Sequence, residues 1–86
     1  MNATILRLPV AKGPFSRSYF YQRISDGLMT RPVRIGRRAV AWPKLEIDAI
    51  NRAVIAGRSN DEIRALVKKL EAQRALADQV DAEVTQ

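Results

Sequence analysis

The spacing of apolar residues predicts a short helix early in the chain. Phe20 and Ile24 lie four residues apart and therefore share one helix face. Ser16 is a suitable N-cap residue, because its hydroxyl can accept a hydrogen bond from a first-turn amide. Gly27 is a suitable stop, because glycine adopts a positive φ at little cost. We expect a helix over residues 16–26, with its apolar face toward the core.

A basic hairpin is predicted directly after this helix. Val33 and Ile35 alternate with Arg34, and period-two alternation is typical of a half-buried strand. The same alternation places Val40 and Trp42 on one face of residues 39–42, with Ala39 and Ala41 on the other. Residues 36–38, Gly-Arg-Arg, form the predicted turn. The hairpin therefore has two arginines near its tip.

A second helix is predicted over residues 43–56. Ile47, Ile50 and Val54 have the i, i+3, i+7 spacing of an apolar helical stripe. Pro43 suits the first helical position, where its missing N–H costs nothing. We expect this helix to pack against Phe20, Ile24 and the inner face of the hairpin, including Trp42.

A third, long helix is predicted over residues 60–83. Ser59 and Glu62 have the spacing of a capping box. Apolar positions then recur every three or four residues, as in a coiled-coil seam. In one interpretation the first half of this helix packs on the domain; in the other the helix contacts a neighbouring protomer. The predicted contact residues are Ile63, Leu66, Leu70, Ala77 and Val80.

These elements predict a mainly α fold with a small β-hairpin wing. The expected architecture is a winged helix-turn-helix over residues 5–57, followed by a C-terminal helix extension over residues 58–86. In such a fold the second helix lies in the major groove of DNA and the wing reaches the backbone or the minor groove. Each part taken alone is also consistent with a purely structural role. The helix would then be a capped helix with one face in the core, and the hairpin tip would be a solvated turn.

Composition excludes several classes of function. The 86-residue chain has no cysteine and no histidine, so thiolate or imidazole metal sites and Ser-His-Asp triads are excluded. We therefore expect no metal, no cofactor and no enzymatic activity. No apolar run approaches the roughly 20 residues of a membrane span, and the N-terminus lacks the apolar region of a signal peptide. A cytoplasmic, nucleoid-associated protein is expected.

The distribution of charge favours a nucleic-acid partner. Residues 1–44 hold nine of the 15 lysines and arginines, but only one of the nine acidic residues, Asp26. A positive half of this kind is typical of nucleic-acid binding. An anionic membrane is the rival partner, but residues 1–44 contain no amphipathic segment with a strong apolar face. RNA ranks below double-stranded DNA, because the aromatic residues show no spacing that makes a stacking platform.

Several short motifs together resemble the AlpA family of phage and integrative-element regulators, which are close in fold to excisionases and the MerR-type winged helix. The matching pieces are Arg7-Leu8-Pro9, Ser16-Arg17-Ser18, Tyr21, Ile24, Gly27 and residues 32–42. The resemblance implies a recognition helix over residues 16–26 and a wing over residues 33–42. The residues expected to contact DNA are Ser16, Arg17, Ser18, Tyr19, Tyr21 and Gln22 in the helix and Arg34, Arg37 and Arg38 in the wing.

Two departures from the family pattern stand out. The segment between Pro9 and Ser16 is about two residues shorter than in the family, which trims the first helix of the helix-turn-helix. Gln22-Arg23 replaces the Arg-Leu that the family tends to have before Ile24. The second departure removes an expected core leucine and moves a basic group, so we expect a different operator sequence.

Three functions are consistent with these features. The first is an excisionase, or recombination directionality factor, of a mobile element; it would bind tandem sites beside an attachment site, bend the DNA and act with a tyrosine or serine integrase. Protomers would then associate along the tandem sites. The second is a transcriptional regulator with the same fold. The third is an interaction adaptor that uses the long C-terminal helix.

Overall fold

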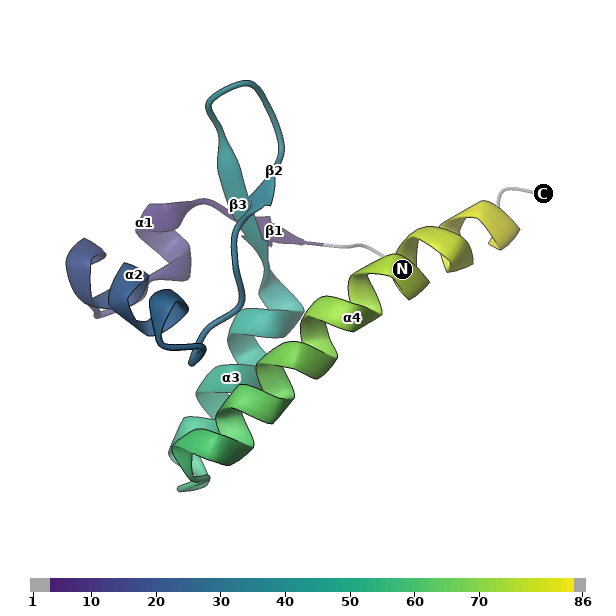
Figure 1. The fold of residues 1–86 in the computed structure, drawn as a ribbon. Coiled ribbons are helices and arrows are strands. Elements are labelled where there is room, and N and C mark those ends of the chain that lie inside the picture. Colours follow the sequence, from purple (N-terminus) through teal and green to yellow (C-terminus); the bar gives the residue numbers. More distant parts are fainter. Residues whose placement is uncertain (1–3, 85–86) are drawn as a thin grey trace.

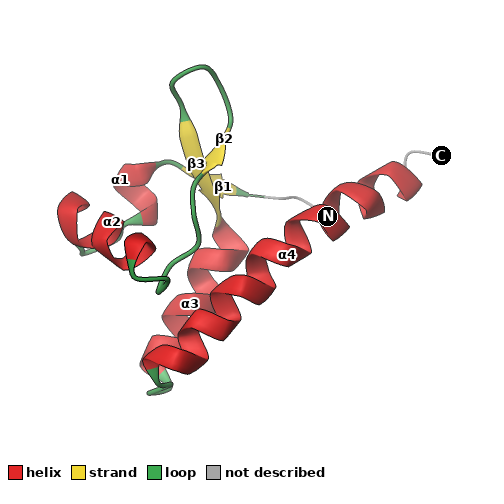
Figure 2. Ribbon diagram, viewed as in Figure 1, coloured by secondary structure: helices red, strands yellow, loops and turns green. Residues whose placement is uncertain are grey.

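The computed structural model describes the backbone of residues 4–84 and the side chains of residues 4–76. The described residues form four helices and a small three-stranded antiparallel sheet, which confirms the predicted fold class (Figures 1 and 2). No helix within the described part of the chain is long and apolar enough to cross a bilayer. The elements in chain order are β1 (Ile5–Leu6), α1 (Leu8–Ala11), α2 (Arg17–Ser25), β2 (Val33–Arg34), β3 (Val40–Pro43), α3 (Lys44–Ile55) and α4 (Asn60–Val84).

Helix α2 begins and ends where its local signals predict. The Ser16 side chain accepts a hydrogen bond from the Tyr19 amide at 3.1 Å, which caps the first turn. Gly27 follows the helix with a φ of +79°, a conformation that disfavours residues with a Cβ atom. Phe20 is fully buried and Ile24 is half-buried against the core. The predicted helix and its apolar face are therefore confirmed.

Strand β3 is the centre of a three-stranded sheet, which the sequence did not indicate. It pairs with β2 in the predicted hairpin and also with β1, where Leu6 lies opposite Trp42. Helices α1 and α3 contact β3 as well. Ala41 is therefore buried together with Trp42, so the predicted alternation of buried and exposed residues is wrong here. Ile35 is exposed instead of facing inward, because it lies past the end of β2 toward the hairpin tip.

Helix α3 directly continues β3. Pro43 is the last residue of β3 and the N-cap residue of α3, one position before its predicted place at the first helical residue. Ile47 and Ile50 are buried as expected, but Val54 is 44% exposed. Near this end of the helix it is Ala53 that packs against the core. The predicted stripe is therefore correct for its first two members and wrong for the third.

The core is built around two aromatic rings. Phe20 and Trp42 are fully buried, with ring centroids 5.1 Å apart in an edge-to-face arrangement. The Trp42 indole N–H donates to the Thr30 carbonyl at 3.0 Å, so its polar atom is satisfied inside the core. The buried residues of the core come from the loop after α2, from β3 and from every helix: Ala11, Phe20, Met29, Trp42, Ile47, Ile50, Ile63 and Val67.

Helix α4 begins with the predicted capping box. The Glu62 amide donates to Ser59 Oγ at 3.2 Å, and the Ser59 amide donates to Glu62 Oε1 at 3.0 Å. The hydrogen bond from the Ser59 amide is the main reason why the pKa of Glu62 is lowered. A reciprocal pair of this kind satisfies two amides that would otherwise lack partners at a helix start.

The first half of α4 packs on the body of its own chain. Ile63 and Val67 are buried in the core, and Leu66 and Leu70 are half-buried against it. The prediction that Ile63 contacts another protomer is therefore wrong, because its side chain is already covered. The predicted contacts of Ala77 and Val80 lie outside the side chains that the structure describes. The C-terminal end of α4 runs on past the rest of the fold (Figure 1).

An ion pair between a buried glutamate and a partly buried arginine joins α3 to α4. Glu46 is only 5% exposed, and Arg74 meets its carboxylate through two hydrogen bonds, from Nε at 2.8 Å and from Nη2 at 2.6 Å. These hydrogen bonds to Glu46 raise the pKa of Arg74. A bidentate pair fixes the orientation of both side chains as well as their separation. Helix α4 is thereby held beside the first turn of α3.

The pair gives a direct prediction for stability. Arg74→Ala leaves the Glu46 carboxylate buried without its partner, and breaking such a pair typically costs about 3–5 kcal/mol. We expect a large fall in the urea midpoint of unfolding. Arg58→Ala is the matched control, because Arg58 also pairs with a glutamate on α4 but both side chains are more than half exposed. Similar midpoints for the two variants would contradict a structural role for the Glu46–Arg74 pair.

Candidate nucleic-acid interface

The outer face of α2 carries exposed polar groups. Ser18, Gln22 and Ser25 follow one another at helical spacing and are exposed. Arg17 is exposed at the first helical residue. The Gln22 amide donates to Asp26 Oδ1 at 3.1 Å within this surface. Guanidinium, amide and hydroxyl groups are the ones that read base edges and phosphates, so the face has the chemistry expected of a recognition helix.

The tyrosines of α2 occupy different environments. Tyr19 is 50% exposed and meets the ring of Phe15, with centroids 5.1 Å apart. Tyr21 is half-buried, with its ring edge-to-face to both Phe20 and Trp42 at 6.2 Å. The ring of Tyr21 is thus mainly a core group, whereas Tyr19 lies at the surface.

The hairpin tip is a second exposed feature, and it is strongly basic. The Ile35 amide donates to the Ala39 carbonyl at 3.0 Å, which closes the turn over residues 36–38. The tip projects beyond the sheet, away from α3 (Figure 2). Arg34, Arg37 and Arg38 are all exposed. None of the three forms an ion pair or a side-chain hydrogen bond with the described residues, so their charge is free for an external anion.

Arg23 has a structural role that the sequence did not reveal. It is half-buried, with its guanidinium 5.5 Å from the centre of the Phe15 ring and its Nη2 donating to the Leu28 carbonyl at 3.3 Å. Both contacts tie the end of α2 to neighbouring loops. Arg23 therefore supports the helix and does not belong to its outer face.

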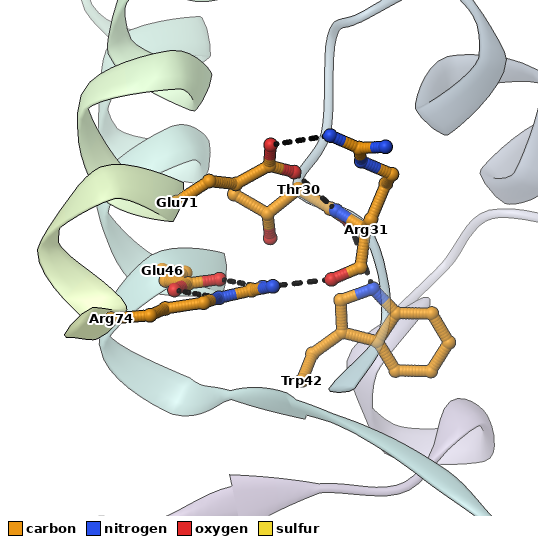
Figure 3. Close-up of polar contacts among 6 residues, drawn as sticks. All are labelled: Thr30, Arg31, Trp42, Glu46, Glu71 and Arg74. Carbon is orange, nitrogen blue, oxygen red and sulfur yellow. Dashed lines mark hydrogen bonds and ion pairs between the residues drawn. The ribbon is translucent and has the colours of Figure 1, made fainter. Parts of the chain in front are cut away.

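The segment that connects the two exposed features is held by α4. Residues 26–32, here called the linker, join α2 to β2. Figure 3 shows Glu71 and Arg74 of α4 on either side of Arg31, with hydrogen bonds to its backbone. Sequence reasoning missed Glu71, Arg74 and Glu46 altogether. Their partners are 28 to 43 residues away in the chain, and no local spacing signals contacts at that separation.

The arrangement as a whole is suited to recognition. It presents hydrogen-bonding groups on a helix and free positive charge on a hairpin, each supported by a packed core. Among the described residues there is no cluster of three or more acidic side chains that could hold a metal ion.

Comparison with known proteins agrees with this geometry. The family described as prophage CP4-57 regulatory protein (AlpA) matches residues 5–50, which is more than half of the chain and includes α2 and the hairpin. Neither the curated proteins nor the solved structures yield a significant match. The chain belongs to the AlpA family of phage regulatory, DNA-binding proteins.

Proposed function

We propose that this protein is an accessory DNA-binding protein of a mobile element that acts as an excisionase, or recombination directionality factor. The observation that carries the proposal is the pairing of a polar, exposed α2 face with an unpaired arginine tip on one small domain. The α2 face suits the major groove, and the tip suits the backbone or the adjacent minor groove. The protein would act in the cytoplasm, on the nucleoid.

The proposed contacts divide into base reading and phosphate binding. Arg17, Ser18 and Gln22 are assigned to base edges, because they carry the donors and acceptors of the exposed α2 face. Ser16 is assigned to a phosphate: its hydroxyl oxygen caps the helix, and the hydroxyl hydrogen remains available to donate. The other residues that we assign to DNA contacts are Tyr19, Tyr21, Arg34, Arg37 and Arg38. Tyr21 is half-buried and is the least accessible of them.

The bias toward excision would come from the shape that the bound protein imposes on the DNA, because no residue of the proposed site is assigned a role in breaking bonds. Bound at tandem sites beside an attachment site, protomers would bend the DNA and bias a tyrosine or serine integrase toward excision. We assign the part of α4 beyond Arg74 to contacts between neighbours, because the helix up to Arg74 is already bound to its own chain. A head-to-tail contact of this kind does not close into a dimer and can follow a row of sites.

A transcriptional regulator of mobile-element genes is the second candidate. The description of the matching family as a regulatory protein favours it, and the same surface would bind a promoter. The adaptor hypothesis has less support, because Ile63 and Val67 place the first half of α4 in the core.

The location of the binding sites separates the two candidates. The first test is a mobility-shift assay on a DNA fragment that carries the element's attachment site, with random DNA as competitor. We expect the protein to shift this fragment into a ladder of discrete bands. An excision assay with the protein's promoter targets deleted then tests the output. Excision that persists in that background supports a directionality factor, whereas its loss supports the regulator. Equal smears on all fragments, lost at moderate salt, would contradict both.

Arg17→Ala tests the recognition helix. If Arg17 makes a bidentate contact to a base, its loss should cost about 1–3 kcal/mol on the specific site and relax the preference at one base pair. The measurement is the dissociation constant on the site and on variants of each base pair, with random DNA alongside. An equal loss on specific and random DNA would remove Arg17 from base reading.

Arg37→Ala tests the wing. Loss of a phosphate contact should weaken binding to all sequences and lower the slope of log affinity against log salt by about one. Arg52→Ala is the matched control, because Arg52 is also an exposed arginine but lies near the end of α3 far from the hairpin. The assignment fails if both variants change the slope equally.

A further inference from the structure

We propose that α4 fixes the position of the wing relative to the recognition helix, and that Glu71 and Arg74 are therefore positioning residues for DNA specificity. The proposal deepens the proposed function and rests on it. It concerns a part of the chain that the family match does not include, because that match ends at residue 50.

The contacts from α4 reach the linker at both of its ends and are made to its backbone. Near α2, Arg64 Nε donates to the Asp26 carbonyl at 2.9 Å. Farther along, Glu71 Oε2 accepts from the Arg31 amide at 2.8 Å, and Arg74 Nη2 donates to the Arg31 carbonyl at 2.7 Å. Bonds to backbone atoms fix the path of the chain, whatever its side chains do.

Arg74, which binds the linker, is also anchored to α3. Arg74 holds the buried Glu46 carboxylate in the first turn of α3 while it donates to Arg31 (Figure 3). Helix α3 continues directly from β3, the central strand that carries the hairpin. Through Arg74, the linker is therefore tied to the element that supports the wing.

A second tie runs through the core. The Trp42 indole N–H holds the Thr30 carbonyl, so adjacent linker residues are fixed by β3 and by α4. The side chain of Arg31 adds little, because it is 78% exposed and its Nη2 lies 3.5 Å from Glu71 Oε1, at the limit of a hydrogen bond. The backbone bonds to Glu71 and Arg74 are thus the contacts that matter.

Fixing the linker matters for specificity in particular. Base contacts need hydrogen-bonding groups held within a fraction of an ångström, and a rigid supporting shell provides this. Phosphate contacts depend mainly on charge and tolerate displacement. A loosened linker should therefore reduce the preference for the specific site while leaving binding to random DNA nearly unchanged.

Glu71→Ala and Glu71→Gln separate position from charge. Both substitutions remove the same negative charge, but only glutamine keeps an oxygen that can accept from the Arg31 amide. Neither should prevent folding, because the Arg31 amide lies in an exposed residue where water can replace the lost acceptor. Arg74→Lys is a further test, because lysine keeps the charge beside Glu46 without the planar group that reaches both Glu46 and Arg31.

The geometry is measured first, in the absence of DNA. The chain has no cysteine, so Ser18→Cys and Arg37→Cys place one spin label on α2 and one on the hairpin tip. We expect a narrow distance distribution in the otherwise unchanged protein and in Glu71→Gln, and a broader or shifted one in Glu71→Ala. Identical distributions in all three proteins would overturn the proposal.

Binding is measured second, on unlabelled proteins. We expect Glu71→Ala to lower the ratio of specific to random affinity by about tenfold at an unchanged salt slope, and Glu71→Gln to keep the ratio. Equal loss in both variants would assign the effect to charge and overturn the proposal. If the unchanged protein prefers no DNA sequence, the proposed function fails, and the role in specificity fails with it. The label distances still decide whether α4 fixes the geometry.

Discussion

The structure depends on the need to pair one buried carboxylate. Glu46 lies in the first turn of α3 with 5% of its surface exposed, and an isolated charge in such a place is very costly. Arg74 meets both of its oxygens, which requires α4 to lie along α3 up to that residue. The same guanidinium also donates to the Arg31 carbonyl. The arginine that pairs with the buried carboxylate therefore also fixes the linker.

Arginines are used in two distinct ways in this chain. Arg23 and Arg74 are partly buried, contact backbone carbonyls and support the fold. Arg34, Arg37 and Arg38 are exposed and form no ion pair with the described residues. Net charge is therefore a poor guide to the size of the DNA-binding surface, because part of the positive charge is already used within the chain. The basic tip and the polar α2 face remain as the groups available to a ligand.

Local signals predicted what is local, and missed what depends on distant residues. The cap at Ser16, the stop at Gly27 and the box formed by Ser59 and Glu62 each involve residues at most a few positions from the helix end, and all three are confirmed. The pairing of β1 with β3 joins segments more than 30 residues apart, and it reversed the prediction for Ala41. A stripe of apolar residues shows that a helix has a buried side, but it does not identify the partner. For this reason the sequence leaves open whether Ile63 contacts a neighbouring protomer or packs on its own domain, and the structure places it in the core of its own chain.

The two interpretations of the long helix apply to different parts of it. Up to Arg74 the inward side of α4 is occupied by the core and the linker, and Leu76, at 57% exposure, is the first large apolar residue beyond that point. Under the proposed function, a contact between neighbouring protomers would use this outer part. The helix is continuous from Asn60 to Val84, so the element available to a neighbour is also the element that holds the linker. Association along DNA and the geometry of base reading would then share one rigid body, which provides a physical route for coupling between them.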